Sequence, residues 1–209
     1  MRKKKTICVL GATGKLGQVV VNELAMQYKI KALVRNPQKI YSSSNVAVLK
    51  GDVTNVNDLK KALQDVVAVV SVLGHGFRTP YPIQEKTMTV LIPLMEKMKI
   101  KRLITVTGSD LFIVGDVESP ILQIQRKLLS TIDPYRMHDA INQQRLLEKS
   151  SLDWTVVRTP RHTNKQPSVV KVENKKPLLI NSVSRVAIAD FVRECIEKDT
   201  WIRKSPIIR

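Results

Sequence analysis

A glycine-rich turn between a short apolar run and a helical pattern constrains the fold most. The run Thr6–Leu10 is rich in β-favouring side chains, and Gly11, Gly14 and Gly17 follow it at intervals of three residues. Apolar residues then recur at helical spacing as far as Ala25. This order predicts a tight turn whose backbone N–H groups and helix N-terminus hold a diphosphate. The alternative interpretation is that the glycines serve only the turn.

The same alternation of strand and helix continues through the first half of the chain. Strands are expected at 30–34, 46–49, 66–73 and 102–107, and helices at 55–63, with Asn55 as N-cap, and at 83–98. Pro93 should kink or interrupt the second of these helices. The pattern predicts an α/β chain, a three-layer, doubly wound Rossmann fold with a mostly parallel sheet, in one domain over residues 1–209.

The rhythm changes after residue 107. We expect one short helix around 121–129, a helix at 135–149, a strand at 154–157 and a basic loop region at 158–177. A last helix is expected at 186–198, with Ser184 as a possible cap. Ligands bind at the carboxyl edge of parallel strands, so residues from about 108 to 180 should supply the substrate side.

The end of the second expected strand discriminates between dinucleotides. NAD sites place an acid there for the ribose 2′-hydroxyl, but Arg35 occupies this point and no acid is present. A guanidinium can clamp a 2′-phosphate and Lys39 can add charge, so NADP(H) is favoured over NAD(H). Asp52, after the third strand, suits the adenine edge or a helix-flanking turn, and the sequence leaves both open.

The charge is strongly positive, with 35 Lys and Arg against 18 Asp and Glu. The basic residues are scattered, and the densest stretch, 158–176, holds six of them and one Glu. A solvated cationic surface with an anionic small ligand is favoured. Nucleic acid is the less favoured partner because aromatic residues make up only 4% of the chain.

The apolar stretches and the cysteines exclude other classes of protein. The stretches fall short of the roughly 20 residues that cross a bilayer, so we expect a soluble chain with no membrane partner. Cys8 and Cys195 lie in apolar patterns, with no Cys or His nearby at metal-ligand spacing. We therefore expect two buried thiols, no metal site and a cytoplasmic location.

These features together resemble a known family. The glycine turn, Arg35, residues 51–53, residues 72–74 and the segment 150–158 are similar to the NAD(P)H-binding (NmrA-like) group of atypical short-chain dehydrogenase/reductases. Within that group the chain looks most like the biliverdin-IXβ reductase, or NADPH-dependent flavin reductase, family. The resemblance spans nearly the whole chain, but its substrate-side matches are fewer than its cofactor matches.

The resemblance implies a role for individual residues. The cofactor-binding positions would be Gly11, Thr13, Gly14, Lys15, Leu16 and Gly17 for the diphosphate, Arg35 and Lys39 for the 2′-phosphate, Asp52 and Val53 for adenine, and Leu73 and Gly74 beside the nicotinamide. Ser109 and His162 would be the catalytic residues beside the nicotinamide and the substrate. A turn serine and a loop histidine are the alternative interpretations of these two.

The chain departs from many short-chain dehydrogenases in its acid–base residues. Those enzymes pair a Tyr with a Lys four residues later, and none of the four tyrosines here has that partner. Gln144 also stands where relatives often carry Glu or His. The first hypothesis is thus an NADPH-dependent reductase of a planar, anionic acceptor, namely a flavin, a tetrapyrrole or a quinone-like ring. A non-catalytic NADP(H)-sensing regulator is the second, and a nucleic-acid-associated protein the third.

Overall fold

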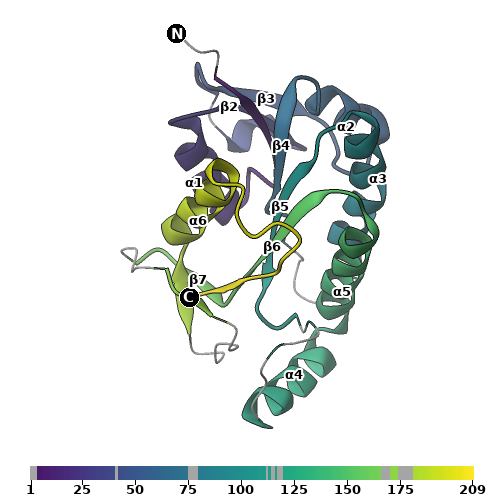
Figure 1. Ribbon diagram of the computed structural model, residues 1–209, viewed down its shortest axis with the longest axis vertical. Coiled ribbons are helices and arrows are strands. Elements are labelled where there is room, and N and C mark those ends of the chain that lie inside the picture. Colours follow the sequence, from purple (N-terminus) through teal and green to yellow (C-terminus); the bar gives the residue numbers. More distant parts are fainter. Residues whose placement is uncertain are drawn as a thin grey trace.

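A mostly parallel sheet forms the centre of the protein, whose computed structural model is shown in Figure 1. The structure describes residues 4–40, 42–74, 80–111, 113, 116, 120–165, 170–173 and 181–209, without the side chains of 122, 125, 126 and 173. Within these residues the main sheet has eight strands in the order β3-β2-β1-β4-β5-β6-β10-β8. The first seven strands run parallel, and β8 pairs antiparallel with β10. The strands are β1 (Thr6–Leu10), β2 (Lys29–Val34), β3 (Val46–Lys50), β4 (Val66–Ser71), β5 (Arg102–Gly108), β6 (Asp153–Thr159), β8 (Val172–Glu173) and β10 (Ile207–Ile208), with β7 (Arg161–Thr163) and β9 (Ser182–Ser184) forming a separate parallel pair.

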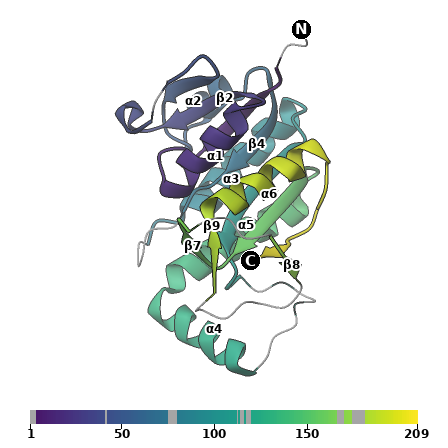
Figure 2. The same cartoon turned by 90° about the vertical axis from the view of Figure 1, so that its left-hand side faces the viewer.

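Helices cover both faces of this sheet. One face carries α1 and α6, and the other carries α2, α3 and α5 (Figures 1 and 2). The helices are α1 (Lys15–Ala25), α2 (Val56–Ala62), α3 (Ile83–Lys97), α4 (Pro120–Ile132), α5 (Pro134–Lys149) and α6 (Arg185–Glu197), with a short 3₁₀ turn η1 (Pro37–Lys39). In β1, Ile7 and Val9 pack into one core, and Cys8 and Leu10 into the other. This alternation makes the strand apolar on both sides, as a buried parallel strand requires.

The order of the strands changes direction beside β1. From β1 the chain builds β2 and β3 on one side, and it then crosses to build β4, β5 and β6 on the other. The carboxyl ends of these strands all lie at one edge of the sheet because the strands are parallel. The predicted doubly wound α/β fold is therefore confirmed, with its switch of direction between β1 and β4.

Several local expectations need correction. Pro93 does not interrupt α3, which runs on to Lys97. Pro93 has no N–H, so the carbonyl of Thr89 lacks its intrahelical hydrogen bond. Both residues are exposed, so water can replace that bond. The region 158–177 is not only loop, since its described part contains the last residues of β6, all of β7 and β8. These strands are too short for period-two alternation to reveal them.

Two further elements differ from the expected pattern. The short helix around 121–129 is the longer α4, which projects from one end of the molecule in Figures 1 and 2. Ser184 is the N-cap residue of α6, but its side chain makes no capping hydrogen bond. None of the described helices combines the length and the apolar character that a membrane span needs.

Candidate functional site

Gly11 and Gly17 bring the start of α1 close to the sheet. Gly11 has a φ of +82°, and a Cβ there would lie 2.8 Å from the carbonyl oxygen of Val72. A Cβ on Gly17 would overlap the carbonyl oxygen of Gly11 and lie 2.8 Å from the Cα of Ala12. Only glycine therefore allows both the turn and the close contact between helix and strand.

The N-terminus of α1 is open to an anion. Its N-cap is Gly14, which has no side chain to accept from the helix, and its first turn contains no acid. By contrast, the side chain of Asn55 accepts from the first turn of α2, and that of Asp133 from the first turn of α5. The uncapped N–H groups and the glycine cradle fit a diphosphate. Thr13, Lys15 and Leu16 complete this loop, and only Leu16 is buried.

Gln18, which the sequence argument did not single out, connects this loop to the neighbouring strand end. Its Nε2 donates to the carbonyl oxygens of Thr13, at 3.3 Å, and of Lys39, at 3.4 Å. Arg35 directly follows β2 and is exposed, as is Lys39 in η1. The backbone of Lys39 therefore lies beside α1, and Arg35 follows the strand next to β1. A polar residue one turn after Gly14 is the only sequence signal for Gln18.

Asp52 follows β3 and serves as a turn residue. Its Oδ1 accepts from the backbone N–H of Thr54 at 2.8 Å and from the Thr54 hydroxyl at 2.7 Å. These bonds, the hydroxyl first, hold the pKa of Asp52 below its ordinary value against the opposing effect of burial, and Arg35 also lowers it. Among the described residues Oδ2 has no hydrogen-bond partner, so the turn role leaves one carboxylate oxygen available. Val53, the next residue, is buried.

Leu73 and Gly74 follow β4 on the other side of β1. The Nε2 of Gln84, in α3, donates to the carbonyl oxygen of Leu73 at 2.9 Å. Asp139, a buried residue of α5, accepts from the backbone N–H groups of Gln84 and Glu85 at 3.1 and 2.8 Å. Asp139 thus caps α3 from another helix and fixes the segment after β4. No local sequence pattern could reveal a cap supplied by a residue so far along the chain.

Thr159, at the end of β6, connects the two predicted catalytic residues. The backbone N–H of Ser109 donates to the carbonyl oxygen of Thr159 at 2.8 Å. The hydroxyl of Thr159 lies 2.8 Å from Nε2 of His162. Ser109 and His162 therefore meet at one residue, on the same edge of the sheet. Thr159 has no signal in the sequence because its role depends on the pairing of β5 with β6.

The hydrogen bonds of Thr159 also assign the tautomer of His162. The Thr159 hydroxyl donates to the carbonyl oxygen of Thr107 at 3.1 Å, and a carbonyl can only accept. When the hydroxyl donates to this carbonyl it accepts from His162, and in that arrangement the imidazole proton is on Nε2. Burial first and Arg185 second lower the pKa of His162 below its ordinary value of 6.5. His162 is therefore neutral at physiological pH, with Nδ1 as an acceptor.

The cysteines are excluded from the chemistry of the site. Burial raises the pKa of Cys8 to about 12 and that of Cys195 to about 11, and both are free thiols. Thiols of this kind are inert. The part of the chain that the structure describes contains no cluster of metal-ligating side chains.

Along the carboxyl edge, the predicted residues follow the order of the strands. Asp52 follows β3, Arg35 follows β2, the glycine loop follows β1, Leu73 follows β4 and Ser109 follows β5. Residues from distant parts of the sequence thus form one row across the switch of direction in the sheet.

Comparisons with known proteins show the family and the fold of the chain. Residues 11–199 match the protein family described as NAD(P)H-binding. No curated protein matches the sequence.

Solved structures show the same fold. The oxidoreductase ylbE from Lactococcus lactis superposes with a TM-score of 0.79 at 19% identity, covering 98% of this chain and 90% of that one. A short-chain dehydrogenase/reductase from Veillonella parvula, in complex with NADP, has a TM-score of 0.79 at 18% identity, covering 99% and 94%. ChuY, an anaerobilin reductase from Escherichia coli O157:H7, has a TM-score of 0.76 at 18% identity, covering 97% and 96%.

Proposed function

Because the chain belongs to the NAD(P)H-binding family, we propose that it is an NADPH-dependent reductase of a conjugated, planar, anionic acceptor. Flavins, tetrapyrroles and quinone-like rings are the acceptor classes. The observation that carries this proposal is the row of groups along the carboxyl edge, from Asp52 at one end to Ser109 and His162 at the other. The similarity in fold to an anaerobilin reductase and to an NADP complex supports it.

The cofactor would lie across the switch of direction in the sheet. The open N-terminus of α1, with Gly14 as its N-cap, would hold the diphosphate, and Arg35 with Lys39 the 2′-phosphate. Asp52 has Oδ2 available for the adenine edge, beside Val53. When bound, NADPH supplies the hydride, and the protein supplies orientation and electrostatics.

The acceptor would bind beside Ser109 and His162. When the Thr159 hydroxyl donates to Thr107, His162 donates its Nε2–H to Thr159 and offers Nδ1 as a hydrogen-bond acceptor. It therefore suits a ring that carries an N–H group, as flavins and tetrapyrroles do. This is a positioning role, and the proton that follows the hydride would come from water. The net charge of +17 favours an anionic acceptor.

Loss of NADPH absorbance with FMN, biliverdin or dichlorophenolindophenol as acceptor tests the proposal. We expect turnover by the wild type and none by Gly14→Val. A Cβ at Gly14 meets only the carbonyl oxygen of Gly11, at 3.4 Å, so we expect this variant to keep its fold while its side chain fills the proposed diphosphate position. Lys29→Ala, at the opposite end of β2, is the matched control and should keep its activity.

Calorimetry with NADPH distinguishes the alternatives. Binding of NADPH without turnover of any acceptor would contradict the reductase proposal. It would support a non-catalytic NADP(H)-sensing regulator, with which the missing Tyr–Lys pair also agrees. Absence of NADPH binding to the wild type would overturn both.

A further inference from the structure

The helix α4 (Pro120–Ile132) exposes a continuous apolar face. Ile121, Ile124, Leu128 and Ile132 are 54%, 68%, 54% and 40% exposed. They recur three and four residues apart, which places them on one side of the helix, and we call them the α4 stripe. α4 projects from one end of the molecule, away from the sheet (Figures 1 and 2). An aliphatic stripe in this position needs a partner that can bury it.

The surroundings of the α4 stripe are positively charged. The helix itself contains Arg126 and Lys127 and no Asp or Glu. Two short strands, β7 and β8, lie in the same half of the molecule as α4 (Figure 2). Arg161 in β7, Lys165 shortly after it and Lys171 just before β8 are all exposed.

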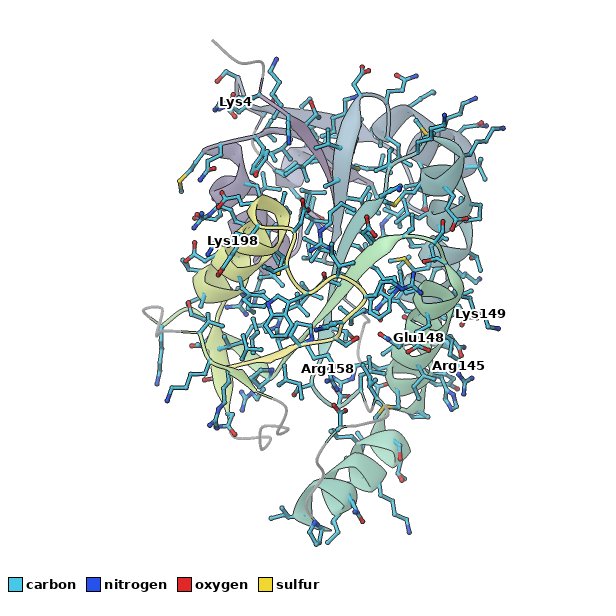
Figure 3. The ribbon with its side chains drawn as sticks, in the orientation of Figure 1. Lys4, Arg145, Glu148, Lys149, Arg158 and Lys198 are labelled. Carbon is cyan, nitrogen blue, oxygen red and sulfur yellow. The ribbon has the colours of Figure 1, made fainter. Side chains whose placement is uncertain are left out.

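Two acidic residues of this region that the structure describes are paired with arginines. Asp116 forms an ion pair with Arg158 at 2.6 Å, and both side chains are almost fully buried. Arg158 is the last residue but one of β6, and Figure 3 labels it in the half of the molecule that leads to α4. Asp110 is paired with Arg136 at 2.6 Å. These acids therefore do little to offset the exposed cations.

We propose that α4 binds the surface of an anionic lipid membrane, with the α4 stripe in the apolar boundary and the surrounding cations at the headgroups. An amphipathic helix with a basic polar side has this mode of binding. A second copy of the chain would bring another +17 charge, and its α4 would contribute two basic residues and no acid. Nucleic acid would match the charge but offers no apolar surface for the stripe.

This mode differs from a membrane span, which the described helices cannot form. It is also independent of the proposed reductase activity, because it rests on α4 and its charged surroundings alone.

Sedimentation with vesicles tests the proposal. We expect the wild-type protein to bind vesicles of phosphatidylcholine with phosphatidylglycerol and to leave vesicles of phosphatidylcholine alone unbound, with binding weakened by salt. Ile124→Asp should reduce the bound fraction about tenfold or more, since a charge enters the boundary layer. Ile124→Leu should keep it.

Met26→Asp is the matched control. Met26 is 67% exposed, and its carbonyl oxygen accepts from Lys4, which Figure 3 places at the end of the molecule opposite α4. This variant should bind like the wild type. Equal binding to both kinds of vesicle, equal loss in Met26→Asp, or no binding at all would overturn the proposal. A wild-type dimer that Ile124→Asp converts to a monomer would assign α4 to a second copy instead.

Discussion

The hydroxyl of Thr159 lies 2.8 Å from Nε2 of His162 and 3.1 Å from the carbonyl oxygen of Thr107, so one side chain connects the imidazole to β5. Because the carbonyl oxygen of Thr159 also accepts from Ser109, this threonine connects the two predicted catalytic residues.

Thr159→Val should allow His162 to adopt both of its neutral tautomers. We expect the wild type to show only the Nε2–H form by imidazole nitrogen NMR, and the variant to show both neutral forms because the acceptor is gone. A wild-type protein with the proton on Nδ1 would contradict the assignment.

Arg185→Gln should raise the pKa of His162, since Arg185 is one of the two causes that lower it. Burial is the larger cause and remains, so the pKa should stay below 6.5. Titration of the imidazole C–H signals measures this, and Lys198→Gln, after the end of α6, should leave the pKa unchanged.

Protein stability should depend on pH because the pKa of His162 is lowered in the folded state. As the pH falls below 6.5, His162 becomes protonated at a higher pH in the unfolded chain than in the folded chain. The stability that neutral His162 contributes is therefore complete above that pH and is lost as the pH falls through the lower, folded value. Arg185→Gln should narrow the pH range over which this stability is lost, because it moves the folded pKa of His162 closer to the unfolded value.

Arg35→Ala should weaken NADPH binding by roughly 10- to 150-fold, or about 1.5–3 kcal/mol, the scale of a charged hydrogen bond. NADH affinity should hardly change, because NADH lacks the 2′-phosphate. Lys29→Ala removes a charge from the other end of the same strand and should affect neither cofactor. Equal losses of both cofactors in Arg35→Ala would show that Arg35 does not discriminate between them.

Gly17→Ala should lower the free energy of unfolding by about 1–3 kcal/mol or more, because its Cβ would overlap backbone atoms of the glycine loop. Thermal unfolding measures this loss. Gly74→Ala is the matched control, since a Cβ there meets nothing within 4 Å. Similar unfolding temperatures for the two variants would mean that α1 does not pack as closely as described.

The two thiols should resist modification. Burial raises their pKa values to about 12 and 11, so an aromatic disulfide reagent should label neither Cys8 nor Cys195 in the folded protein and both in urea. Stability should also fall as the pH rises above 9.0, where only the unfolded thiols ionise. Rapid labelling of the folded protein would rule out their burial.

The sequence predicts the first half of the fold well because its signals are local. The glycine loop, the apolar run of β4 and the cap at Asn55 each depend on neighbouring residues, and the structure contains a turn, a buried strand and a capped helix at these places. Arg35 and Ser109 could be placed at strand ends because parallel strands end at one edge.

The rest depends on contacts between distant residues. Asp139 caps α3, which begins more than fifty residues before it. Arg158, in β6, forms an ion pair with Asp116, which precedes α4 in the sequence. Neither pair leaves a periodic pattern. β7, β8 and β10 consist of two or three residues, too few for alternation to show.

The position of β10 affects how the protein is made. Ile207 and Ile208 occupy the place beside β6, although β6 itself ends at Thr159. While a ribosome is still adding the residues in between, β6 has unpaired backbone groups along one side. Such an open strand can pair with another nascent chain. This edge of β6 is therefore open to such pairing until residues 203–208 have been added and have paired with it.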